Sequence, residues 1–441
     1  MKNIKFLSAC LAFLAGLAYT ASGATNGVVL GQNFQSVIDA SSSGDTLIVQ
    51  PGVYPDTNVV FNKALTVLPS GTNGSPIQFL GTIQVQGPGV SSFQRAYFGT
   101  NVQTTSATVS FFDSYFNGAV NVAGGKVTMK RTILNYPLTL SNNAAMEALR
   151  MTNNATVTAT AASGSGTPFL AVQSSFFDSV ALSGYKVWLG YNNFTNSTVK
   201  SFCLGETNCD SVLIGNKFTL NNPSPGTVIY ETGGTLKAFN NLVLGNASYG
   251  SPWTGIGLNS TPAEIVNNTI RANMYPGPDI FGIQAGGVGL ITIRANVIYF
   301  TSIGGGYGGG SDADVQATGA ASQSVFVSYC DLWAGNPNTT IVQLLGVSPV
   351  PVNCLLQVDP NLAADGTLNP GSPCINAGPP ETIYNNRDGT RNTMGYTGGP
   401  YYNPANYTNN NPMIFLLIGQ QTAIKGIQTT IPVSVGASAG H

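Results

Sequence analysis

The amino-acid sequence predicts an all-β solenoid, in which strands joined by turns stack coil upon coil. Three observations support this prediction: a strand unit that recurs at a nearly constant spacing, an asparagine at the same place in each unit, and very few stretches with helical periodicity. A period in this range is typical of stacked repeats, and alternation of apolar residues within the unit indicates strands.

Each repeat unit has two alternating inward positions, two spacers, Asn, one spacer and a further apolar residue. The five clearest copies are Val187-Leu189-Asn192-Phe194, Ser211-Leu213-Asn216-Phe218, Leu236-Ala238-Asn241-Val243, Ala263-Ile265-Asn268-Ile270 and Ile291-Ile293-Asn296-Ile298. Successive Asn positions are separated by 24, 25, 27 and 28 residues (216−192, 241−216, 268−241, 296−268). Val325-Val327-Cys330-Leu332 continues the series with Cys in place of Asn, and earlier copies have Ser114 or Thr132 there.

Stacking places equivalent residues of successive coils about 4.8 Å apart. At this spacing the five repeated Asn side chains can hydrogen-bond to one another in a buried column, which satisfies their amide groups. We therefore expect Asn216, Asn241 and Asn268 to share one interior column.

The composition fits such a stack. Only 8% of the 441 residues are charged, against about 25% in ordinary globular proteins. Polar uncharged residues at turns can keep a solenoid soluble. The sequence has no basic patch that would neutralise phosphates, so we expect no nucleic-acid partner.

The N-terminus has the pattern of a signal peptide. Lys2 and Lys5 precede an apolar run from Phe6 to Tyr19, and small residues follow it up to Ala24. We predict that residues 1–24 are a signal peptide and that the mature protein is secreted, extracellular or at the cell surface. Its removal leaves 15 basic residues (17−2) against 18 acidic ones. We expect no transmembrane span, because the apolar run at 413–418 is too short to cross a bilayer.

The region after the signal peptide predicts a cap and a first coil. We assign residues 25–45 to an N-terminal cap, in which Phe34, Val37 and Ile38 share one face of a short helix. The following segment, GDTLIVQPGVYPDTNVVFNKALTVL from Gly44 to Leu68, alternates short strands with turns.

This segment resembles the first coil of the right-handed parallel β-helix proteins of the pectate-lyase-like group. The residues from Asp359 through the Asn-Pro-Gly-Ser-Pro-Cys run that ends at Cys374, and then Arg387-Asp388-Gly389-Thr390-Arg391, are similar to the closing region of many bacterial members. The resemblance implies a right-handed parallel β-helix over residues 46–358 and an irregular C-terminal closure over residues 359–441. It speaks to architecture rather than to chemistry.

Five cysteines remain after the predicted cleavage, so at least one has no partner within the chain. Cys203 and Cys209 enclose five residues at a turn, and we predict a disulfide between them in an oxidising compartment. The pairing of Cys330, Cys354 and Cys374 stays open. The sole histidine is His441, so the sequence offers neither a zinc site of ordinary spacing nor a histidine-based triad.

Two classes of enzyme, glycoside hydrolases and polysaccharide lyases, require residues that can be sought in the sequence. A glycoside hydrolase needs paired carboxylates, but Asp113 and Asp178, which share a Phe-Phe-Asp-Ser context, lie about three coils apart. A polysaccharide lyase needs a basic residue that removes a proton, for which Lys237 and Arg271 are the candidates. Lys237 and Glu264 occupy one outward column in adjacent coils, where a surface ion pair is the competing interpretation.

The remaining candidates concern binding. Exposed aromatic rings suit sugars, and Trp188, Trp253 and Tyr307 are placed on an outer face or in loops between coils. Packing of these rings beneath loops is the competing interpretation. Asp312 and Asp314 follow a glycine run and could contribute to a Ca²⁺ site, although a solvated turn is the competing interpretation. We expect a secreted or cell-surface scaffold that contacts carbohydrate or another cell-surface polymer. A lyase acting by β-elimination on an acidic polysaccharide is the alternative.

Overall fold

The computed structural model describes residues 23–71, 74–87, 89–162, 165–203, 209–221, 226–246, 252–274, 279–302, 313–318, 324–334, 342–344, 351–402, 404, 413–418 and 433–438. They divide into two compact units. Residues 23–402 form the first unit, and the described C-terminal strands belong to the second. No helix among the described residues has the length and apolarity needed to cross a membrane.

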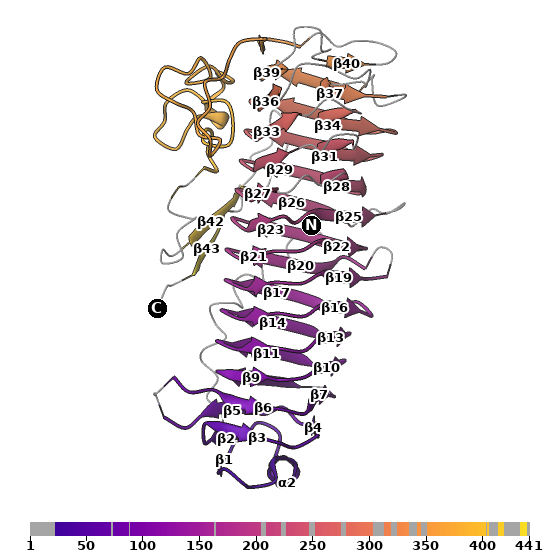
Figure 1. The fold of residues 1–441 in the computed structure, drawn as a ribbon, viewed down its shortest axis with the longest axis vertical. Helices are drawn as coiled ribbons and strands as arrows, with labels where there is room; N and C mark the ends of the chain where they lie inside the picture. The colour runs from indigo at the N-terminus through magenta and orange to yellow at the C-terminus, as the bar shows by residue number, and fades with distance from the viewer. Residues whose placement is uncertain are drawn as a thin grey trace, which may run out of the picture. The chain divides into compact units, whose positions relative to one another are not determined.

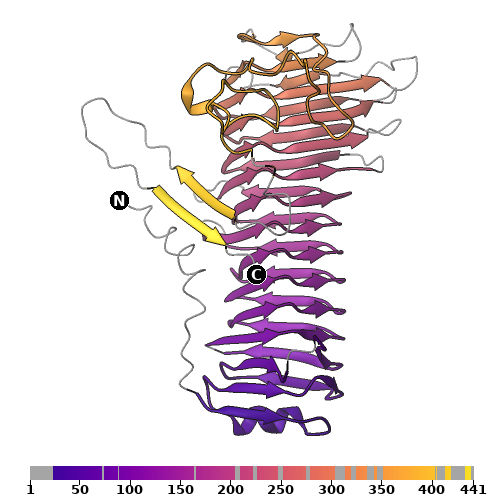
Figure 2. The same ribbon diagram turned by 90° about the vertical axis from the view of Figure 1, so that its left-hand side faces the viewer.

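The first unit is a right-handed parallel β-helix, as predicted. Three parallel sheets of 14, 14 and 13 strands run along it, and each coil contributes one strand to each sheet (Figures 1 and 2). We call them sheets A, B and C.

Sheet A contains, in spatial order, β1 (Thr25–Val28), β2 (Thr46–Val49), β5 (Thr66–Pro69), β8 (Val90–Gln94), β11 (Thr108–Phe112), β14 (Lys126–Lys130), β17 (Ala145–Leu149), β20 (Thr167–Val172), β23 (Tyr185–Gly190), β26 (Asp210–Ile214), β29 (Thr235–Phe239), β32 (Ala263–Val266), β35 (Ile291–Arg294) and β38 (Val325–Ser328).

Sheet B contains β3 (Gly52–Tyr54), β6 (Ile77–Phe79), β9 (Ala96–Phe98), β12 (Tyr115–Phe116), β15 (Ile133–Leu134), β18 (Thr152–Asn153), β21 (Ser175–Phe176), β24 (Asn193–Thr195), β27 (Lys217–Thr219), β30 (Leu242–Asn246), β33 (Thr269–Met274), β36 (Val297–Ser302), β39 (Asp331–Ala334) and β41 (Leu355–Leu356).

Sheet C contains β4 (Asn58–Phe61), β7 (Thr82–Gln86), β10 (Val102–Thr105), β13 (Val120–Ala123), β16 (Leu138–Ser141), β19 (Val157–Thr160), β22 (Val180–Ser183), β25 (Val199–Cys203), β28 (Gly226–Gly233), β31 (Trp253–Asn259), β34 (Ile280–Gly286), β37 (Ala313–Ala317) and β40 (Val342–Leu344).

The predicted capping helix is α2 (Phe34–Ala40), at the indigo end of the stack in Figure 1. The Asn33 side chain caps it by accepting a hydrogen bond from the backbone N–H of Ser36 at 2.8 Å. Phe34 and Ile38 are fully buried, and the Phe34 ring packs edge-on against Tyr54 and Phe79. The helix therefore closes the first coil with apolar side chains, which keeps water from the open end of the core.

The predicted asparagine column is confirmed. In Asn192, Asn216, Asn241 and Asn268, the backbone N–H and the side-chain Nδ2 both donate to Oδ1 of the Asn in the next coil, at 2.8–3.0 Å. Each Nδ2, including that of Asn296, also donates to a carbonyl oxygen of the preceding coil at 2.8–2.9 Å. These fully buried amides are thus satisfied within the column.

Residues 359–402 belong to the first unit and pack on the later coils. The Tyr191 hydroxyl donates to the carbonyl of Tyr401 at 2.7 Å, and the Phe239 ring stacks on Tyr401 at 5.1 Å between centroids. The Asn267 amide donates to the carbonyl of Thr393 at 2.7 Å. This segment contains the short 3₁₀ helix η3 (Thr382–Tyr384). In the second unit, β42 (Met413–Ile418) pairs antiparallel with β43 (Val433–Ser438).

Candidate functional site

The structure separates the three aromatic residues predicted to contact sugars. Trp188 points outward from β23 and is half-buried. Trp253 begins β31 and is 0% exposed. Its indole lies against Gly245 and meets the Phe300 ring edge-on at 6.4 Å. The placement of Trp253 in an accessible loop was therefore wrong, because a ring packed in the core cannot stack on a sugar. Tyr307 lies outside the described residues.

The outward neighbours of Trp188 are apolar. Register places Leu170 of β20 on one side and Val212 of β26 on the other, and both are half-buried. The Lys186 ammonium lies 3.7 Å from a carboxylate oxygen of Asp210 beside this strip. An aromatic ring between aliphatic side chains, with a charged pair at its edge, has the chemistry of a sugar platform. The role of Trp188 stays a prediction.

The residues proposed for β-elimination are not assembled in one site. Lys237 and Glu264 are register partners in sheet A, but they form no ion pair in the part of the chain that the structure describes. Arg271 lies in sheet B, and its guanidinium donates to the carbonyls of Ala363 and Ala364 at 3.0 and 2.8 Å. Its guanidinium carbon also lies 6.0 Å from the centre of the Tyr299 ring. Arg271 thus holds the C-terminal closure against sheet B, and its role as a base stays a prediction.

A second arginine is engaged in the same way. Arg294 lies 3.9 Å from a carboxylate oxygen of Glu381, and its guanidinium carbon is 5.0 Å from the centre of the Tyr384 ring. Both partners belong to the closing segment. Arg271 and Arg294 therefore serve the packing of residues 359–402 on the coils.

The environment of Asp314, one of the two predicted calcium ligands, differs from the solvated turn that was the competing interpretation. Asp314 lies within β37 and is fully buried, and neither of its carboxylate oxygens has a hydrogen-bond partner among the described residues. Burial raises its pKa well above the usual range, and the nearby Asp331 adds to this effect. The expectation of a solvated turn at Asp314 was wrong. Asp312 lies outside the described residues, and among those described no three His, Cys, Asp or Glu side chains converge on a metal position. A calcium ion held by Asp312 and Asp314 stays a prediction.

The cysteines lie in different environments. Cys209 is buried, but the side chain of Cys203 lies outside the described residues, so their disulfide stays a prediction. Cys374 is buried, and its thiol donates to a carboxylate oxygen of Asp331 at 3.0 Å. Burial raises the pKa of Asp331 to about 7. Cys330 and Cys354 lie in adjacent coils at the end of the asparagine column.

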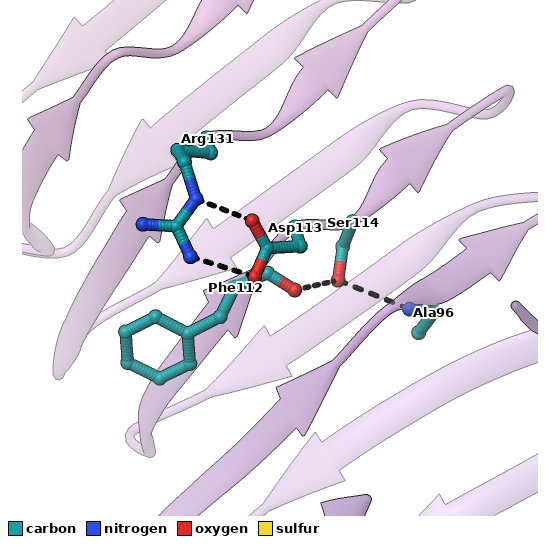
Figure 3. A network of polar contacts seen from close by, with 5 residues as sticks. All are labelled: Ala96, Phe112, Asp113, Ser114 and Arg131. Atoms are coloured by element: carbon teal, nitrogen blue, oxygen red, sulfur yellow. Dashed lines mark hydrogen bonds and ion pairs between the residues drawn. The ribbon is translucent and has the colours of Figure 1, made fainter. Parts of the chain in front are cut away.

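Charged side chains gather on one edge of the early coils. Arg131 forms a two-point ion pair with Asp113 of the preceding coil, in which its Nη2 lies 2.7 Å from Oδ2 (Figure 3). Next to it, Ser114 accepts a hydrogen bond from the Ala96 N–H at 3.2 Å within the interior column (Figure 3). Burial lowers the pKa of Lys130, and the neighbouring Arg131 and Arg150 lower it further. Lys126 and Glu147 pair at 2.5 Å on the outer face of sheet A.

The outer face of sheet C in the same coils has no charged side chain. We call the outward residues of β7, β10, β13, β16, β19 and β22 the neutral face. They are Thr82, Gln84, Gln86, Gln103, Thr105, Asn121, Ala123, Thr139, Ser141, Thr158, Thr160, Ala181 and Ser183. All but the two alanines carry an amide or a hydroxyl group. The face ends at Lys200 of β25, whose register partner on β22 is Ala181.

Regular spacing makes the neutral face a lattice of polar groups. Gln84, Gln103, Asn121, Thr139 and Thr158 follow one another in register along five strands. Neighbours in this column are about 4.8 Å apart, and the parallel column two residues along each strand lies about 6.6 Å away. Sequence reasoning did not single out this face, although its signal, Thr, Gln or Asn alternating with apolar residues, is visible in the sequence.

Comparisons with known proteins assign no family. No protein-family model matches the chain, and no curated protein matches it. A solved structure, that of pectate lyase Pel9A, is similar with a TM-score of 0.30 and 14% sequence identity, over 84% of this chain and 95% of that chain. A likeness at this level carries no argument about activity, and the fold stated above rests on the strand registers.

Proposed function

We propose that this protein is a non-catalytic β-helix scaffold that contacts an uncharged, hydroxyl-rich polymer, namely a neutral polysaccharide, through the neutral face of sheet C. The observation that carries the proposal is the segregation of charge. In the coils from β7 to β22, the charged groups lie on sheet A and at its edge, except for Asp178 in the turn that precedes β22. The outward side chains of the sheet C strands are uncharged.

The chemistry of the face favours a sugar polymer. Amide and hydroxyl groups both donate and accept hydrogen bonds, as do the hydroxyls of a sugar. An acidic polymer would find no cation on this face between Thr82 and Ser183. Many weak contacts repeated along a rigid lattice can combine into useful avidity.

The engagement of Arg271 favours binding without turnover. A base for β-elimination must reach the proton that it removes, and this guanidinium is held by two backbone carbonyls. This engagement weighs against Arg271 as the base of a lyase, for which Lys237 is the other candidate.

The test is retention of the full chain on insoluble cellulose, xylan and mannan, with polygalacturonate and alginate as acidic comparisons. We expect retention on at least one neutral polymer and no release of unsaturated products from any of them. The double variant Thr158→Lys/Thr160→Lys should weaken retention at least about tenfold, because two hydrated ammonium groups would interrupt the lattice. Thr292→Lys, on the outer face of sheet A, is the matched control and should retain binding.

Two results would refute the proposal. Equal retention of the double variant and the control would show that the neutral face is not the contact surface. Unsaturated products from an acidic polymer, lost in Lys237→Ala, would establish the lyase instead.

A further inference from the structure

The asparagine column ends in two cysteines. Asn296 Nδ2 lies 3.9 Å from the sulfur of Cys330, which thus occupies the next place in the column. The backbone N–H of Cys330 then donates to the sulfur of Cys354 at 3.3 Å. The first four column asparagines make the equivalent contact from their backbone N–H to the side chain of the next Asn, at 2.8–3.0 Å. Cys354 is therefore the last member of the column.

Strand register sets the two cysteines directly opposite each other. Ser328 pairs with Val352, and Asp331 pairs with Leu355. Both pairs are 24 residues apart (352−328, 355−331), as are Cys330 and Cys354 (354−330). Neighbouring parallel strands are separated by about 4.8 Å. Disulfides form across Cα separations of roughly 4.4–6.8 Å, so the bond needs no large backbone movement.

We propose that Cys330 and Cys354 are joined by a disulfide in the oxidised protein, which covalently links the last two coils of the β-helix. The oxidant is a disulfide of a small molecule or of a protein. The thiolate of Cys354 attacks one of its sulfurs, forming a mixed disulfide and releasing one thiolate. The sulfur of Cys330, losing its proton, then attacks the Cys354 sulfur and releases the second thiolate. The two thiol protons and two electrons leave with the reduced oxidant.

The surroundings of the two thiols fit this order of steps. Cys354 is partly exposed, whereas Cys330 is fully buried, so an external oxidant reaches Cys354 first. Hydrogen bonds from the thiol and the backbone N–H of Cys330 lower the pKa of Cys354, which raises its thiolate fraction. Burial raises the pKa of Cys330, so this residue suits the second, intramolecular step.

Cys374 is a poor competitor for either thiol. It is buried in an apolar cluster between the C-terminal closure and the coils, which includes Met394 and Val297, and its thiol donates to Asp331. Burial, followed by the negative charge of Asp331, raises its pKa. A low thiolate fraction makes it slow to react with a disulfide.

The bond would matter because the end of the stack is weakly held. β41 has two residues and pairs only with β39 among the described strands. Leu356 within this strand is 45% exposed, and Val352 shortly before it is 56% exposed. A covalent link that closes a loop of 24 residues removes many unfolded arrangements of this coil.

The test equilibrates the full purified chain with excess oxidised glutathione, and in parallel with excess dithiothreitol. Free thiols are then alkylated in denaturant, and the protein is digested without reductant for mass spectrometry. We expect one linked peptide pair containing residues 330 and 354, two hydrogens lighter than the sum of its parts, with Cys374 alkylated. Hydrogen exchange of the Leu355 amide should be roughly tenfold or more slower in the oxidised sample.

Two variants provide matched comparisons. Cys354→Ser should abolish the link and the slower exchange, whereas Cys374→Ser should keep both. Alkylation of both Cys330 and Cys354 after oxidation would overturn the proposal, as would a persistent glutathione adduct on Cys354 or a link from Cys354 to Cys374. The peptide map of the wild-type chain decides the matter even if a variant fails to fold.

Discussion

Asn241 donates twice to Asn268: its backbone N–H and its side-chain Nδ2 both lie 2.9 Å from Oδ1 of Asn268. The same Nδ2 also donates to the carbonyl of Leu213 at 2.9 Å. One fully buried amide thus connects three successive coils. This geometry makes the column a sensitive point for stability.

Asn241→Leu should lower the free energy of unfolding by roughly 1–3 kcal/mol, because it leaves buried donors and acceptors of Asn216 and Leu213 without partners. Denaturant unfolding measures the loss. Asn193→Leu is the matched control, since Asn193 is exposed on β24, and should change stability by less than about 0.5 kcal/mol. Equal effects of the two changes would contradict the column as a source of stability.

Trp253→Ala should be severely destabilising, by about 3–5 kcal/mol, because it empties a fully buried volume against Phe300. Gly245→Ala probes the same contact, since a Cβ there would lie 2.5 Å from the indole ring. Denaturant unfolding again serves as the measurement. A mild effect of both changes, together with lost polysaccharide retention, would restore the binding role first expected for Trp253.

Glu231 makes stability depend on pH. Its carboxyl is 2% exposed and accepts a hydrogen bond from the Ser201 hydroxyl at 3.1 Å. Burial raises its pKa well above the usual 4.5, so the folded chain holds a proton that the unfolded chain releases. The stability that protonated Glu231 contributes is therefore fully present below pH about 4.5, and it declines as the pH rises towards the pKa of the folded state.

Glu231→Gln should remove this dependence, since an amide does not ionise. Between pH 5 and 8, the free energy of unfolding should fall less in Glu231→Gln than in the wild-type chain. We expect the two decreases to differ by about 1 kcal/mol or more. Melting temperatures across this range provide the measurement. Glu147→Gln on the outer face of sheet A is the control and should follow the wild-type slope; identical slopes for all three chains would contradict the assignment.

The Asp113–Arg131 pair should contribute little to stability despite its two-point geometry. Both side chains are partly exposed, at 28% and 38%, and exposed pairs contribute about 0–1 kcal/mol. Asp113 also has a positive φ of 51°, which Asn tolerates and a β-branched residue does not. Asp113→Asn should therefore cost less than about 1 kcal/mol and Asp113→Val about 1–2 kcal/mol more, as measured by denaturant unfolding. The reverse order would refute the backbone argument.

Trp188→Ala tests the outer face of sheet A separately from the neutral face of sheet C. If the half-buried ring stacks on a sugar, this change should weaken the binding free energy for a neutral polysaccharide by about 1–3 kcal/mol, which lowers retention. Leu170→Ala, the outward neighbour on β20, is the comparison and should have a smaller effect. Unchanged retention of Trp188→Ala would leave the neutral face as the contact surface.

The sequence by itself determined the fold because its signals are local and repeated. Three local patterns predict contacts between adjacent coils: alternation within each strand, the spacing of Asn192 through Asn296, and the capping helix at Phe34. Because each coil stacks on the next in the same way, these contacts repeat along the whole solenoid. The place of Cys330 in the column is also readable from the sequence, because Val325, Val327 and Leu332 repeat the apolar pattern around it.

Only the tertiary structure shows which residues far apart in the sequence contact each other, and which side chains of an irregular strand are buried. Arg271 finds its partners 92 and 93 residues away, and no periodicity reports that the chain returns over its own coils. The sequence places Trp253 outside the repeated apolar columns and therefore predicts a loop position, whereas the structure puts it at the start of β31. Its burial depends on the space that Gly245 leaves on β30, the preceding strand of the chain. Packing in three dimensions, rather than the local pattern, determines whether such a side chain is available for function.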